Sequence, residues 1–192
     1  ENFEKIDLAK KYNFEMKFVT PVLKILSDRK LTFKRQKLLK GGQQTDGNIF
    51  LNYRKTLSGI HDILKEEIEF YRRSPCRSQQ NFIRKWPDKF KLLGWVIAME
   101  NYGKLAPHMH EEGWLSGCLY INVPPKNSPT SGNLVVCLDD DRCSLNPDEN
   151  TKKMIHVKTG DLCLFPASLL HYTIPFRSKE QRIVLAFDVV PS

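Results

Sequence analysis

The second half of the chain consists of short apolar segments that are separated by turn-forming residues. Most of these segments are rich in valine, isoleucine, leucine or aromatic residues. The segments are residues 94–100, 117–123, 132–138, 161–165, 171–174 and 182–189. Glycine, proline, asparagine and aspartate lie between these segments. Short strands with such separators are typical of an antiparallel sandwich or barrel. The pattern therefore predicts a mainly β fold in this half.

The first half has the spacing of helices. Residues 5–27 carry apolar side chains at roughly helical intervals, and Pro21 marks a break or a new helix N-terminus. Residues 41–45, Gly-Gly-Gln-Gln-Thr, are expected to form a loop. Residues 56–73 are strongly amphipathic, with one apolar stripe made of Leu57, Ile60, Ile63, Leu64, Ile68 and Tyr71. We expect these helices to pack on the outer face of the sheet.

Length and charge set the broad class. A chain of 192 residues corresponds to one domain, or to one domain with a helical extension. The sequence contains no signal-peptide pattern and no apolar run of the roughly 18 residues that cross a bilayer, so a membrane partner is not expected. The net charge is +8, and most of the excess lies in the first half, as expected for solvated helix faces. Nucleic-acid binding is therefore not expected.

The cysteines indicate a reducing compartment. There are five of them, an odd number, and none forms a CxxC pair. Cys118, Cys137 and Cys163 lie within apolar, strand-like segments, where cysteine behaves as a small buried hydrophobic residue. We therefore expect unpaired thiols and a cytoplasmic protein.

Three of the five histidines have the spacing of metal ligands. His108 and His110 are two residues apart, so an extended strand places both on one face, and His171 arrives from another segment. Two ligand sets compete: His108, His110 and His171, or His110, Glu112 and His171. The second is the usual set of two histidines and one carboxylate for non-heme iron(II). Spacing alone does not separate them, because both near pairs are two residues apart.

Two further side chains are expected to face the interior of the barrel. In 182–189, Arg182 begins a face of small residues, and the guanidinium group binds carboxylates in a bidentate manner. In 116–123, Tyr120 shares a face with Ser116, Cys118 and Asn122, a polar mixture that favours the lining of a pocket over a packed core. The turn at 111–115 and an acidic loop at 139–153 are candidates for a substrate-selecting rim.

A long ordered motif connects these residues. It begins at His108 as His-x-His-x-x-Gly-Trp-Leu-Ser-Gly-x-x-Tyr-Ile-Asn-Val-Pro and continues with Ser-Gly-Asn-Leu at Ser131. Gly-Asp-Leu-x-Leu-Phe-Pro-x-x-Leu-x-His then ends at His171, and an Arg-Ile strand follows. The motif resembles the 2-oxoglutarate/iron(II) oxygenases, in particular the branch often fused to tetratricopeptide repeats in bacterial proteins. The resemblance covers residues 41–192, and residues 1–40 are expected to form an N-terminal helical extension.

The resemblance implies a fold, an activity and roles for single residues. The fold is a double-stranded β-helix, a cupin-like jelly roll, and the activity is hydroxylation of a C–H bond in an unknown substrate, with release of succinate and CO2. Iron(II) is held by His108, His110 and His171. Arg182 pairs with the distal carboxylate of 2-oxoglutarate, and Tyr120 also binds this cosubstrate. The first histidine pair departs from the superfamily norm of His-x-Asp or His-x-Glu.

Two other functions stay open on the sequence alone. A cupin-like metal enzyme that does not use 2-oxoglutarate needs no arginine at position 182. A non-catalytic binding module on a degenerate barrel needs no metal. For the oxygenase, the expected partners are 2-oxoglutarate, O2 and an unidentified substrate, and a homodimer is possible.

Overall fold

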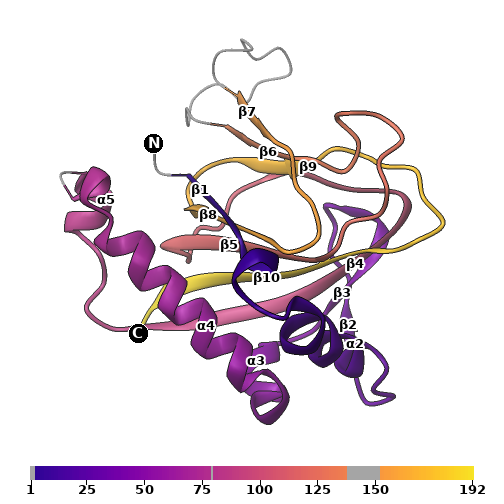
Figure 1. The fold of residues 1–192 in the computed structure, drawn as a ribbon, viewed down its shortest axis with the longest axis horizontal. Helices are drawn as coiled ribbons and strands as arrows, with labels where there is room; N and C mark the ends of the chain where they lie inside the picture. The colour runs from indigo at the N-terminus through magenta and orange to yellow at the C-terminus, as the bar shows by residue number, and fades with distance from the viewer. Residues whose placement is uncertain (1–2, 79, 138–151) are drawn as a thin grey trace.

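The computed structural model describes residues 3–78, 80–137 and 152–192 (Figure 1). The acidic loop expected at 139–153 falls mostly outside these residues. The strands are β1 Glu4–Asp7, β2 Phe33–Lys34, β3 Leu39–Thr45, β4 Phe90–His108, β5 Leu115–Asn122, β6 Leu134–Cys137, β7 Lys152–Ile155, β8 Asp161–Pro166, β9 His171–Thr173 and β10 Arg182–Pro191. The helices are α1 Leu8–Lys11, the π-helix η1 Glu15–Val19, α2 Thr20–Leu26, α3 Ile49–Asn52, α4 Arg54–Arg73, the 3-10 helix η2 Pro75–Arg77 and α5 Asn81–Arg84.

One curled antiparallel sheet contains these strands. Its order is β1-β8-β5-β10-β4-β9-β6-β7, and β3 and β2 are attached beside β4. The curl passes through β4, whose successive stretches pair with β10, β3 and β9. The strands predicted from the alternating segments are all present, and the fold is mainly β with flanking helices, as expected.

The sheet separates two apolar clusters. On β10, Ile183, Leu185, Phe187 and Val189 face outward and pack with the helices, whereas Val184 and Ala186 face inward. The alternation in this strand predicts both faces correctly. The inward face encloses the space in which the candidate site lies.

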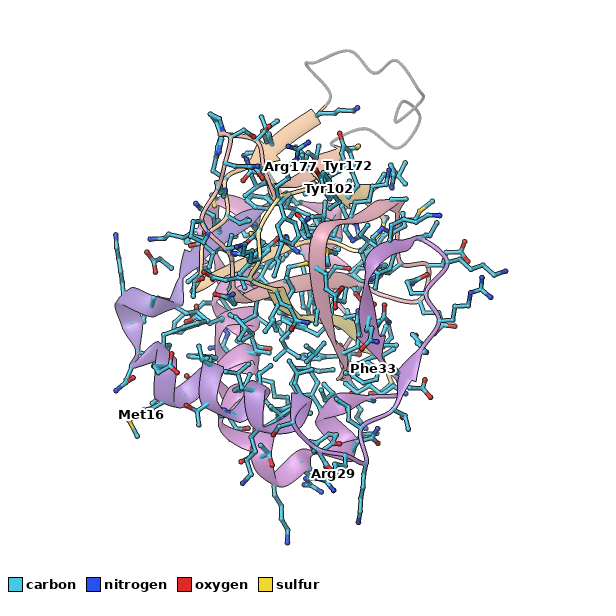
Figure 2. All side chains as sticks on the ribbon, turned by 90° about the vertical axis from the view of Figure 1, so that its right-hand side faces the viewer. Met16, Arg29, Phe33, Tyr102, Tyr172 and Arg177 are labelled. Carbon is cyan, nitrogen blue, oxygen red and sulfur yellow. The ribbon has the colours of Figure 1, made fainter. Side chains whose placement is uncertain are left out.

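Helix α4 covers the outer face of the sheet (Figure 1). Leu57, Ile60, Leu64, Ile68 and Tyr71 are all buried, so the predicted stripe is the packed face of this helix. Figure 2 shows the helical side of the molecule at the bottom, where Met16 and Arg29 are labelled, and Tyr102, Tyr172 and Arg177 at the opposite end.

Two segments differ from the sequence prediction. Residues 41–45 belong to β3 rather than to a loop, because Gly41 adopts a φ of +59° and Gly42 lets the backbone approach β4 closely. Within residues 1–40, where only helices are expected, β1 adds an edge strand by pairing with β8, and β2 pairs with β3. Both differences arise from pairing with strands that are distant in the sequence, which local patterns do not encode.

The cysteines follow the prediction only in part. Cys118 and Cys163 are free thiols within the fold, and burial raises the pKa of Cys118 to about 12. Cys137 instead takes part in a disulfide. In the part of the chain that the structure describes, no helix combines the length and the apolarity needed to cross a membrane.

Candidate metal centre

His108 and His171 face each other across two paired strands. His108 is the last residue of β4, His171 is the first residue of β9, and the two are direct partners in the antiparallel register. Their ring centroids are 4.2 Å apart. The strand pairing therefore brings together side chains that are far apart in the sequence.

His110 lies just beyond β4 and is held by a carboxylate. Its Nδ1 is 2.7 Å and 2.8 Å from the two carboxylate oxygens of Asp188. The Ser116 hydroxyl donates to the same carboxylate at 2.7 Å. The His110 ring centroid lies 5.1 Å from those of His108 and His171. Contacts with β5 and β10 thus position His110. The spacing predicts that it shares one extended strand with His108, but β4 ends at His108.

All three imidazoles have an acceptor at Nδ1. His108 Nδ1 is 2.8 Å from the Ala106 carbonyl oxygen, and His171 Nδ1 is 3.0 Å from that of Leu169. Because a carbonyl oxygen only accepts, the proton of each neutral ring is on Nδ1, and Nε2 keeps a free lone pair. One ring nitrogen from each histidine lies within 4.8 Å of the other two. Three oriented imidazoles of this kind are a donor set that fits a divalent transition metal.

Burial keeps two of these rings neutral. It lowers the pKa of His108, with a smaller opposing effect from the Ala106 carbonyl, and it holds the pKa of His171 well below the usual range. Desolvation disfavours the charged imidazolium form. A neutral imidazole is the form that binds a metal, so the environment favours ligation.

Arg182 is buried without a carboxylate partner. It is only 2 % exposed, and its guanidinium carbon lies 5.0 Å from the ring centre of Tyr120, which is also buried. Its Nη1 contacts the Met99 sulfur at 3.8 Å, while Nε has no hydrogen-bond partner. Within residues 3–78, 80–137 and 152–192 it forms no ion pair. A buried, uncompensated cation of this kind favours an anionic ligand.

The three histidines, Arg182 and Tyr120 line one cavity. Its other walls are largely apolar and include Leu105, Leu134 and Val184. The sequence predicts all five of the named polar residues as site residues, and the structure brings them to this single space. The cavity therefore contains both the candidate metal ligands and a cationic side chain that can bind an anion.

Glu112 does not join the histidines. It is exposed and lines an open groove next to His108 and His110, together with Glu111. The group of potential metal ligands found among the described residues contains only the three histidines.

Asp188 belongs to the centre although no role for it is predicted from the sequence. It is 5 % exposed, and its contacts are to His110 and Ser116. The sequence does contain a clue to its position. Asp188 is an even number of residues from Arg182, so both side chains lie on the inward face of β10. A carboxylate on the interior face of a strand requires a partner.

Comparisons with known proteins identify a matching family and similar folds. Residues 94–188 match the model of a family described as putative 2OG-Fe(II) oxygenase. This segment contains the three histidines, Tyr120, Arg182 and Asp188. A search of curated protein sequences gave no significant match.

Solved structures of 2-oxoglutarate oxygenases share the fold. A prolyl hydroxylase from Trichoplax adhaerens, in complex with a hypoxia inducible factor peptide, has a TM-score of 0.68 at 12 % identity, over 98 % of this chain and 83 % of that one. A prolyl-4-hydroxylase from Pseudomonas putida has a TM-score of 0.66 at 9 % identity, over 100 % and 93 %. HygX from Streptomyces hygroscopicus, with nickel and 2-oxoglutarate bound, has a TM-score of 0.64 at 13 % identity, over 100 % and 83 %. The double-stranded β-helix expected from the sequence motif is thus confirmed.

Proposed function

We propose that the chain is a 2OG-Fe(II) oxygenase in which His108, His110 and His171 hold iron(II) and which hydroxylates a C–H bond of its substrate. The match of residues 94–188 to the family model supports this proposal. The observation that carries the proposal is the joint placement in one cavity of three oriented imidazoles and a buried arginine that has no carboxylate partner among the described residues. When bound, iron(II) and 2-oxoglutarate couple the decarboxylation of 2-oxoglutarate to succinate and CO2 with the transfer of one oxygen atom of O2 to the substrate.

The residues of the chain bind and orient the reactants. Asp188 and the carbonyl oxygens of Ala106 and Leu169 fix the orientation of the three rings, so that Nε2 of each ring is available to the metal. Arg182 binds the distal carboxylate of 2-oxoglutarate with paired N–H donors, and the Tyr120 hydroxyl donates to the same group. Burial raises the pKa of Tyr120 well above its usual range, so the hydroxyl keeps its proton. The apolar walls exclude water from the reacting groups.

Metal-dependent succinate release tests the proposal. The purified protein with added iron(II), 2-oxoglutarate and O2 is expected to release succinate, and His171→Ala is expected to abolish both this release and metal binding. His61→Ala, in helix α4 outside the cavity, is the matched control and should keep both. No metal uptake by the unaltered protein would contradict the proposal.

Arg182 separates this function from a metal enzyme that does not use 2-oxoglutarate. Arg182→Met is expected to weaken 2-oxoglutarate binding about 10- to 100-fold, because charge-assisted hydrogen bonds are lost. Metal affinity should stay unchanged. Calorimetric titration with 2-oxoglutarate measures the change, with the exposed Arg177→Met as control. Unchanged 2-oxoglutarate affinity and unchanged activity would favour the cupin-like alternative.

A further inference from the structure

Gln44 is a buried polar side chain of the cavity that has no part in holding the metal or 2-oxoglutarate. Its backbone pairs with Lys34 on β2 and with Ile97 on β4. Its side chain is 3 % exposed and lines both the cavity of the three histidines and the open groove beside it. Among the residues that the structure describes, no group hydrogen-bonds to its amide.

An amide without a protein partner in such a place is available to a ligand. The amide is not enclosed by protein and stays accessible from the cavity and the groove, so a ligand there can bond to it without displacing a protein partner. The Gln44 amide lies where the cavity and the groove meet, because both are lined by Gln44 together with His108, His110 and Trp95. A molecule that lies across this junction is therefore next to both Gln44 and the histidines.

Trp95 supplies an apolar wall at the same place. It lies on β4 on the same strand face as Ile97 and Met99, and all three line the cavity. Its ring centroid is 5.5 Å from that of His110. A ligand group held between Gln44 and Trp95 therefore lies directly beside the proposed metal ligands.

The charges around this point favour an uncharged ligand group. Asp188 is already paired with His110 and Ser116. Arg182 is used by 2-oxoglutarate in the proposed function. The remaining charged residues of the groove, Lys34, Glu111 and Glu112, are exposed. Water screens these exposed charges, whereas the buried group at this point, Gln44, offers only a neutral amide. Burying a charged ligand group against this amide alone is costly.

We propose that Gln44 and Trp95 form the substrate-binding part of the site, and that they take a neutral group that both donates and accepts hydrogen bonds, an amide or a hydroxyl. The primary amide of Gln44 offers one acceptor and two donors, which matches such a group. The reacting C–H bond of the substrate then lies next to this amide or hydroxyl. This inference rests on the proposed function.

The binding of small molecules that carry an amide or a hydroxyl group tests this inference without knowledge of the substrate. The protein is loaded with zinc(II) and 2-oxoglutarate, and the indole N–H signals of its three tryptophans are followed by NMR, with Trp95→Phe used to assign the Trp95 signal. N-methylacetamide and ethylene glycol represent the amide and the hydroxyl. We expect one or both to shift the Trp95 signal in a saturable manner, whereas acetate and methylammonium should not.

Two variants of neighbouring glutamines identify the contact. Gln44→Leu is expected to raise the dissociation constant of the binding probe about fivefold, the effect of one net hydrogen bond. Gln43→Leu, on the exposed face of the same strand, should leave it unchanged. Zinc and 2-oxoglutarate affinities should be equal in both variants, which separates this inference from the proposed function. Equal probe binding by Gln44→Leu, saturable binding of acetate or methylammonium, or no probe binding to the unaltered protein would overturn the inference.

Discussion

At the scale of single residues, the candidate centre depends on what lies behind each imidazole. Asp188 is the only charged group among the three Nδ1 acceptors described above, and it contacts His110 with both oxygens. A carboxylate behind a ligating histidine orients the ring and raises the basicity of the ligand nitrogen. His110 lies outside a strand, so it depends on this contact more than His108 and His171, whose backbone belongs to β4 and β9.

Removal of the Asp188 carboxylate should therefore weaken metal binding. Asp188→Ala is expected to lower zinc(II) affinity about 10- to 100-fold, as measured by competition with a chelator. Asp188→Asn keeps one acceptor oxygen and should have a smaller effect. Asp62→Ala, an exposed residue of α4, is the control. If Asp188→Ala binds zinc as tightly as the control does, the carboxylate has no role in the metal centre.

At the scale of secondary structure elements, the central strand β10 packs closely on both of its neighbours. Phe187 is opposite Gly94 on β4 and opposite Gly117 on β5. A Cβ atom at position 117 would overlap the ring of Phe187. The absence of a side chain at this position therefore makes room for a large buried ring in the outer core.

Gly117→Ala should destabilise the fold by about 1–3 kcal/mol, because an extra methyl group overpacks a filled core. Urea unfolding measures the change. The matched control is Gly59→Ala in α4, where an added Cβ meets nothing within 4 Å. Since glycine costs a helix about 0.5–1 kcal/mol relative to alanine, the control should gain stability. The free energy of unfolding should therefore fall in Gly117→Ala and rise in Gly59→Ala. Equal changes in the two variants would contradict the packing argument.

At the scale of the whole molecule, partly buried ion pairs attach the N-terminal segment to the rest of the fold. Glu67 of α4 is 2 % exposed, and the Lys11 ammonium group donates to its two oxygens at 2.8 Å and 2.9 Å. Arg77, also buried, donates to Glu4 of β1 at 3.0 Å. Residues of the predicted helical extension thus compensate buried charges of the remaining chain, so we expect both parts to unfold together.

Lys11→Met should leave the buried Glu67 carboxylate without its partner. We expect a loss of about 1–3 kcal/mol in the free energy of unfolding, measured by urea denaturation as a single transition. The double variant Lys11→Met with Glu67→Leu should recover much of this loss. Lys10→Met, at an exposed side chain, should change stability by less than about 0.5 kcal/mol. Two separate transitions would show that the N-terminal segment folds independently.

The sequence alone predicts the strands of the second half, helix α4 and five of the polar residues that line the cavity, namely the three histidines, Tyr120 and Arg182. The alternation in 182–189 predicts which side chains of β10 face inward, and the stripe in 56–73 predicts the packed face of α4. These predictions succeed because the periods of strands and helices are local properties of the chain. The histidine spacing indicates a metal site for the same reason.

Only the tertiary structure decides which groups meet inside the cavity. His110 contacts Asp188 across 78 positions of sequence, Arg182 lies beside Tyr120 without a carboxylate, and β3 turns Gln44 toward the histidines. Each of these depends on the register between strands distant in the sequence, and register follows from the packing of the whole sheet. The sequence by itself thus determined which residues are available to the site, and the folded sheet determined their partners.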